Sequence, residues 1–123
     1  MTRLPFQYVV LRCVPRVDRE EFVNVGVVLY SQAADYLSCA SHLEEPRLLS
    51  LAADLDIASV QAALDAVADC CAGSGPSAFI SLGQRFGWIA APKSTTIQPG
   101  SVHGGLTEDP DIELAHLVDI LVR

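Results

Sequence analysis

The chain has 123 residues, of which 50% are hydrophobic and 19% are charged, and its 15 acidic and 8 basic residues give a formal net charge of −7. This composition excludes an intrinsically disordered chain and predicts a single folded domain over residues 1–123. The negative charge argues against nonspecific binding to nucleic acid, which lysine and arginine drive, and no apolar run reaches the roughly 20 residues of a membrane-spanning helix.

The N-terminal third of the chain predicts three consecutive strands. Residues 6–14 and 22–30 both alternate between two faces, and the proline and charges between them are typical of a turn. A short polar connection then leads to a weaker strand over residues 36–41. The three strands are therefore expected to form an antiparallel meander.

One face of the first two strands is predicted to be core, and the other face holds candidate binding residues. The core face takes the apolar residues of both strands: Val9, Leu11, Cys13, Val23, Val25, Val27 and Leu29. The expected register of the other face has three pairs: Val14 with Phe22, Arg12 with Asn24, and Val10 with Gly26. An apolar face with a few polar groups is typical of an interaction surface. Its candidate residues are Tyr8, Arg12, Asn24 and Gly26.

A purely structural explanation of the same face remains open. Gly26 would then mark a β-bulge or a close crossing of two backbones. The guanidinium of Arg12 would be hydrogen-bonded by Asn24, Glu20 or Glu21 within the chain.

The rest of the chain predicts helices, with one ambiguous segment. Pro46 begins a short helix, and Asp56 caps a longer amphipathic helix that ends at Gly73. Between residues 77 and 106, FGWIAA and STTIQ are each interpreted as a short strand. Asp109 and Pro110 begin a C-terminal helix. The predicted fold class is α+β: an antiparallel β-sheet starting with a three-strand meander, with two or three α-helices packed on one face.

A second set of polar residues lies among prolines and glycines between residues 92 and 109. A lysine beside hydroxyl groups is a typical anion site, and serine, histidine and aspartate together suggest nucleophilic catalysis. The segment contains no phosphate-binding loop, no nucleophile elbow and no HExxH motif. We therefore predict no catalytic residue here, and the candidate binding residues are Lys93, Ser94, Thr95, Gln98 and His103.

The cysteines and histidines do not predict a metal site or a cofactor. The four cysteines include an adjacent pair but no CxxC motif, and the three histidines are scattered along the chain. Free thiols that pack as small hydrophobic groups explain the cysteines better than disulfides do. Such thiols fit the reducing cytoplasm, so we expect a soluble, cytoplasmic protein.

Two long segments of the sequence resemble the DUF3037 family of small bacterial proteins. They are YVVLRCVPRVDREEFVNVGVVLY near the N-terminus and RFGWIAAPKSTTIQPGSVHGGLTEDPDIELAHLVDILV near the C-terminus. Arginine is common in the family where this chain has Lys93, and that change removes the two-pronged fork that binds a carboxylate or phosphate. The family has no assigned function. Its members are often encoded beside a HipA-like kinase, so the resemblance implies a partner or regulator in a toxin-antitoxin-like or signalling pair.

Three functional hypotheses follow. The first is a noncatalytic interaction or regulatory module, whose second sheet face or C-terminal polar loop contacts a protein partner such as a HipA-like kinase. The second is a small-molecule-binding protein or an enzyme for an anionic, nucleotide-like substrate, which requires Arg12, Lys93, Thr95 and His103 to converge on one cavity. The third is a homodimer that pairs through the apolar sheet face or the alanine-rich middle helix.

Overall fold

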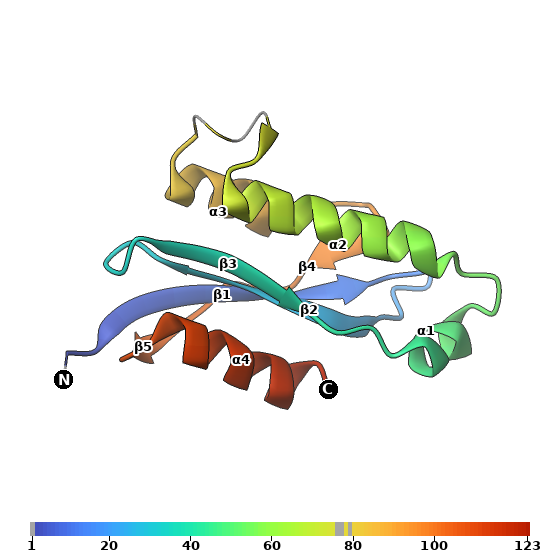
Figure 1. The fold of residues 1–123 in the computed structure, drawn as a ribbon. Helices are drawn as coiled ribbons and strands as arrows, with labels where there is room; N and C mark the ends of the chain where they lie inside the picture. The colour runs from blue at the N-terminus through green and yellow to red at the C-terminus, as the bar shows by residue number, and fades with distance from the viewer. Residues whose placement is uncertain (1, 76–77, 79) are drawn as a thin grey trace.

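The computed structural model describes residues 2–75, 78 and 80–123, and these residues form five strands and four helices (Figure 1). In chain order they are β1 (Leu4–Cys13), β2 (Val23–Ser31), β3 (Tyr36–Ser41), α1 (Glu45–Leu51), α2 (Ile57–Ala72), α3 (Leu82–Ala90), β4 (Ile97–Pro99), β5 (His103–Thr107) and α4 (Pro110–Leu121). The antiparallel sheet begins with the β1-β2-β3 meander, which confirms the predicted α+β class. None of the described helices has the length and apolar character needed to cross a bilayer.

The first strand of the chain lies in the middle of the sheet. The strand order is β3-β2-β1-β4, and β5 also pairs with β1. β4 pairs with residues 11–13 of β1, and β5 pairs with residues 4–8. Residues 97–107 therefore follow β1 as one interrupted edge strand, with a break at residues 100–102.

Helices cover both faces of the sheet (Figure 1). Two helices, α2 and α3, pack on one face, where the larger core cluster includes Val9, Leu11 and Leu64; packing on this face was predicted for the helix after Asp56, which is α2. The fourth helix, α4, packs on the opposite face over a second cluster that includes Val27, Leu29 and Leu117. The prediction of helices on one face only thus misses α4, because its apolar stripe does not reveal which face of the sheet it covers.

A β-bulge corrects the predicted register of the first two strands. Arg12 lies opposite Asn24 as predicted, but Gly26 lies opposite Leu11 rather than Val10. Val25 is the extra residue between these pairs, so the alternation of β2 changes face at this point. Consequently Val27 and Leu29 face α4, while Val28 joins the α2 and α3 side. The proposed common core face of β2 is therefore wrong after residue 25.

Gly26 is buried and leaves no gap on the sheet face. A Cβ atom built on it would lie 3.0 Å from the backbone oxygen of Ala40 and 3.4 Å from the Cβ of Ser41. The structural explanation of this glycine, a bulge with a close backbone approach, is therefore the correct one.

The predicted helix caps are confirmed, but one predicted strand is wrong. The side chain of Asp56 accepts hydrogen bonds from the first-turn amides of α2, and Asp109 does the same for α4. Gly73 ends α2 in the left-handed conformation, with φ of 75°. The segment FGWIAA, predicted as a strand, lies in α3, which Ser81 caps. β5 was not predicted.

Candidate functional site

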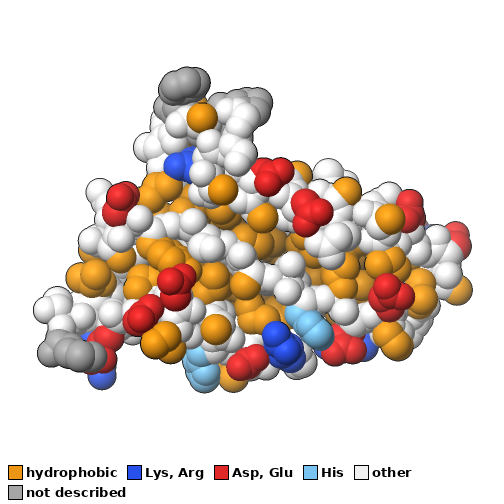
Figure 2. Space-filling model, in the orientation of Figure 1, with side chains coloured by type: hydrophobic (Ala, Val, Ile, Leu, Met, Phe, Trp, Pro, Cys, Tyr) orange, Lys and Arg blue, Asp and Glu red, His pale blue; other side chains and the backbone are white. Residues whose placement is uncertain are grey.

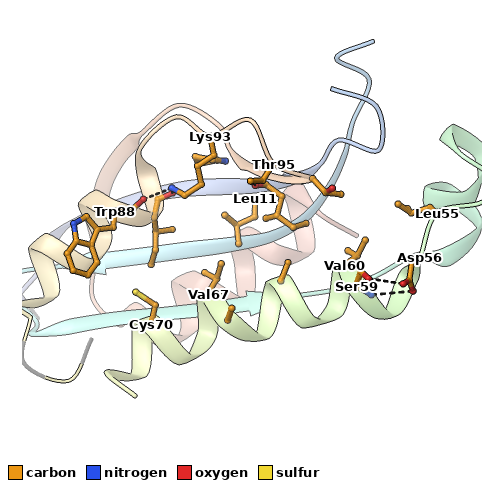
Figure 3. Close-up of a pocket in the computed structure, with 16 residues that line it drawn as sticks. Leu11, Leu55, Asp56, Ser59, Val60, Val67, Cys70, Trp88, Lys93 and Thr95 are labelled. Atoms are coloured by element: carbon orange, nitrogen blue, oxygen red, sulfur yellow. Dashed lines mark hydrogen bonds between the residues drawn. The ribbon is translucent and has the colours of Figure 1, made fainter. Parts of the chain in front are cut away.

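A groove lined mainly by apolar side chains lies between α2, α3 and residues 91–99 (Figure 3). Its volume is about 640 Å³, which falls in the usual range of ligand pockets. The apolar face of α2 forms one wall, and Leu11 of β1 lies at the back. Trp88 lies at the α3 end of the groove with 55% of its surface exposed. The 16 lining residues are Leu11, Leu55, Asp56, Ser59, Val60, Ala63, Ala66, Val67, Cys70, Trp88, Ile89, Lys93, Thr95, Thr96, Ile97 and Pro99.

Lys93 lies at the α3 end of the groove, but its ammonium group is occupied by backbone carbonyls. Nζ donates to the carbonyl oxygens of Trp88, Ile89 and Ala91, which lie at the C-terminal end of α3. Burial lowers the pKa of Lys93. A lysine at this position interacts favourably with the negative end of the helix dipole. The ammonium group of Lys93 therefore caps the C-terminal end of α3.

The other main polar side chains of the groove are also used within the chain. Thr95 Oγ1 donates to the carbonyl of Ile97 at 2.7 Å. At the opposite end, Asp56 accepts hydrogen bonds from the hydroxyl and the backbone amide of Ser59, which lower the pKa of the Asp56 carboxyl. Among the described residues that line the groove, no acid and base are hydrogen-bonded to one another, and the groove presents mainly apolar surface.

A simple chemical test follows from the position of Cys70 in the groove. At pH 8, iodoacetamide is expected to modify Cys70 before the other three cysteines. Burial raises the pKa of Cys39 to about 11 and of Cys71 to about 12, and it also raises the pKa of Cys13. The reactive thiolate is therefore scarce at those three positions. Peptide mass spectrometry after short labelling times measures the order, and faster labelling of Cys39 than Cys70 would contradict it.

A second open surface lies on the α4 side of the sheet. α4 packs mainly on β2 and β3, and on β1 its core cluster takes in Phe6 and the partly buried Tyr8 but not Val10 or Arg12. The uncovered half, which we call the β1 shelf, carries Tyr8, Val10 and Arg12 of β1 with Phe22 and His103 beside them. The rings of Tyr8 and His103 lie 5.3 Å apart, and Phe22 is 43% exposed.

Arg12 and Asn24 are neighbours on this shelf, as the sequence predicted. The guanidinium Cζ of Arg12 lies 4.2 Å from the centroid of the Phe22 ring. Asn24 Nδ2 donates to the carbonyl of Leu121 at 3.0 Å and so caps the end of α4. Neither Asn24 nor the nearby Glu20 and Glu21 bonds the guanidinium of Arg12, so that part of the structural explanation is wrong.

The sequence-predicted binding residues separate into two groups on opposite faces of the sheet. Lys93 and Thr95 line the groove, whereas Arg12 and His103 lie at the β1 shelf. The four residues required by the anionic-substrate hypothesis therefore do not share a cavity. Of the remaining candidates, Gln98 donates to the carbonyl of Thr95 and Ser94 is exposed near the groove.

The groove itself was missed by sequence reasoning. Its walls come from α2, α3 and β1, and no short motif joins these segments. One usable signal was present, because Ser81 and Gln84 have the spacing of a capping box and would have predicted the helix that carries Trp88.

On the face shown in Figure 2, acidic side chains are spread among hydrophobic ones, and basic side chains are few. Among the described residues, no group of three or more His, Cys, Asp or Glu side chains is placed to hold a metal ion. The four cysteines are free thiols, and Cys13 and Cys71 are buried.

A family model described as a protein of unknown function (DUF3037) matches residues 8–122. No curated protein and no solved structure matches the chain.

Proposed function

Because the chain belongs to the DUF3037 family, whose description assigns no activity, we propose that it is a noncatalytic interaction module that docks a protein partner in the groove between α2 and α3. The match spans nearly the whole chain, so the proposal applies to the family domain rather than to an appended segment.

The observation that supports this proposal is the use of the groove's main polar groups inside the chain. Lys93, Thr95 and Asp56 each bond to neighbouring groups of the same chain, so they stabilise the walls rather than await a substrate. The parts of the groove left to contact a partner are its apolar surface and the exposed ring of Trp88. Partly exposed aromatic residues in apolar grooves are typical of protein docking sites.

The partner proposed first is a HipA-like kinase, because the family resemblance implies such a neighbour. The regulatory role and a cytoplasmic location belong to the same proposal, and the free thiols of the chain favour that compartment. An amphipathic helix that inserts apolar side chains into the groove is the binding mode that its shape favours.

Two alanine substitutions on the same helix test the docking site. Ala66 lines the groove, whereas Ala62 is exposed on α2 outside it. Ala66→Glu is expected to weaken binding of the neighbouring kinase roughly 30-fold, because the complex would bury a charge without a partner. Ala62→Glu should leave the affinity within about twofold. Both positions are exposed in the free chain, so both variants should fold.

Isothermal titration calorimetry of the purified pair measures the two affinities, and Cys70 alkylation gives a second readout. The bound kinase should slow modification of Cys70 in the unmodified chain. Equal weakening by the two substitutions, or undiminished labelling of Cys70 in the complex, would place the kinase elsewhere. Absence of any complex would reject the kinase as partner.

A further inference from the structure

Arg12 is a cation that finds an aromatic ring but no hydrogen-bond acceptor in the described part of the chain. Six of the other seven basic side chains are paired: Arg16, Arg19 and Arg123 with carboxylates, and Arg47, Arg85 and Lys93 with backbone carbonyls. Arg3 is exposed near the N-terminus, where water solvates it. Arg12 is partly buried, yet none of its nitrogen atoms has a hydrogen-bond acceptor among residues 2–75, 78 and 80–123. The chain has 15 acidic residues, so the lack of an acceptor beside Arg12 is a property of this position and does not reflect a shortage of carboxylates.

The surroundings hold the guanidinium in place without satisfying it. One contact is the Phe22 ring, and another is Gly100, where a Cβ would lie 3.0 Å from Nη2 and 3.4 Å from Cζ. Arg12 Nε is buried without an acceptor, and Asn24 Oδ1 is buried without a donor in the described chain. Buried polar atoms are normally hydrogen-bonded, so two unmet groups at one register pair require an explanation. If Arg12 served only to pack against its neighbours, an uncharged side chain could do so without the cost of removing a charge from water.

The geometry points to an acidic peptide as the ligand of this surface: we propose that the β1 shelf binds a segment of another protein through an Asp or Glu carboxylate held by Arg12. A planar guanidinium recognises a carboxylate with two parallel hydrogen bonds. Phe22 lies against the guanidinium, and Val10 and Tyr8 of the same strand are partly exposed; this apolar surface favours a peptide over a free ion. The glycine at position 100 gives the guanidinium room that any side chain would reduce.

The β1 shelf is separate from the groove. Leu11, the neighbour of Arg12 on β1, faces the groove from the other side of the sheet. The shelf and the groove therefore lie back to back across one strand, and each can be altered without changing the other. Failure of one proposal leaves the other standing.

A pair of capped tripeptides tests the proposal with one group changed. The peptides are acetyl-Leu-Glu-Phe-amide and acetyl-Leu-Gln-Phe-amide, titrated into the ¹⁵N-labelled full chain at low salt and followed by NMR. The glutamate peptide is expected to shift the amide signals of residues 8, 12, 22 and 24 in a saturable manner. The glutamine peptide should bind at least tenfold more weakly.

Substitutions of single arginine residues identify the cation that binds the glutamate peptide. Arg12→Gln should reduce the affinity for the glutamate peptide about tenfold, and Arg12→Lys should reduce it severalfold because the charge remains without the fork. Arg3→Gln, which removes the same charge from an exposed position, should leave the affinity within twofold. Retention of spectral dispersion shows that each variant is folded.

Three results would overturn the proposal. They are equal affinities for the two peptides, equal effects of the Arg3 and Arg12 substitutions, and loss of peptide binding in the groove variant Ala66→Glu. Inorganic phosphate is the remaining probe. If phosphate alone shifts the same signals and displaces the glutamate peptide at lower concentration, the surface is a phosphate site and the assignment to a carboxylate is wrong.

Discussion

Replacing Arg85 by methionine is expected to lower the free energy of unfolding by about 3 kcal/mol. Arg85 is 8% exposed, and its guanidinium donates to the carbonyls of Ile80, Cys70 and Cys71 at 3.0, 3.0 and 2.9 Å. These bonds join the C-terminal end of α2 to the start of α3. Methionine would remove the guanidinium donor from all three carbonyls, of which Cys70 O keeps the backbone amide of Gly73. Hydrogen bonds to charged groups contribute about 1.5–3 kcal/mol each, and their losses are not additive.

Urea denaturation followed by circular dichroism measures this loss. Arg123→Met is the matched control, because Arg123 pairs with Asp119 at the surface and its removal should cost no more than about 0.5 kcal/mol. Arg85→Lys tests the geometry, since it keeps the charge but cannot reach three carbonyls from a fork. A cost for Arg85→Met as small as that of the Arg123 control would show that water satisfies the released carbonyls.

Gly26→Val is expected to destabilise the fold by about 3 kcal/mol, at the upper end of overpacking costs. Its Cβ would press on the Ala40 backbone oxygen, and the added methyl groups would meet Leu11, whose Cδ1 lies 3.6 Å from that Cβ. Both neighbours belong to adjacent strands, so relief requires the sheet to move. The hairpin would shift its register or lose the bulge.

Gly87→Ala on α3 is the control for this prediction, because a Cβ there meets nothing within 4 Å. In an exposed helix, that change should raise the free energy of unfolding by roughly 0.5–1 kcal/mol. In thermal denaturation, Gly26→Val should melt at a lower temperature than the unmodified chain, and Gly87→Ala at a higher one. A Gly26→Val protein as stable as the unmodified chain would mean that the β2–β3 pairing has freedom that the contact distances do not indicate.

The sequence predicts the meander and the helix caps because each depends on local chemistry. Asp56, Gly73 and Asp109 act within one turn of the chain, and their roles follow from residue type. The bulge at Val25 is different, since every residue from Val25 to Leu29 is compatible with either face. When both faces of a sheet are covered, apolar residues on both sides leave no pattern to show where alternation changes.

The α3 segment shows how tertiary context decides between helix and strand. Phe86, Trp88 and Ile89 favour strands by propensity, and Gly87 disfavours a helix. The cap at Ser81 and the burial of Phe86 and Ile89 against α2 and the sheet select the helix instead. β5 was missed for the opposite reason, because its paired glycines are rare in strands.

The candidate sites were partly predictable. Tyr8, Arg12 and Asn24 were placed on one surface by alternation, and the structure groups them with Phe22. The groove is lined by residues more than 70 positions apart in the sequence, such as Leu11 and Trp88, and no local pattern shows that such segments come together. The sequence predicts Lys93 as an anion-binding residue because it does not show that three carbonyls at the C-terminal end of α3 lie within hydrogen-bonding distance of its ammonium group.

The central position of β1 also affects how the protein is synthesised. Residues 4–13 are translated long before residues 97–107, which form the strand on their far side. On the ribosome, one margin of β1 therefore stays unpaired until most of the chain has been translated, and non-local pairing of this kind slows folding. An unpaired strand edge can pair with strands of other chains, so nascent chains should depend on chaperones more than the finished protein does.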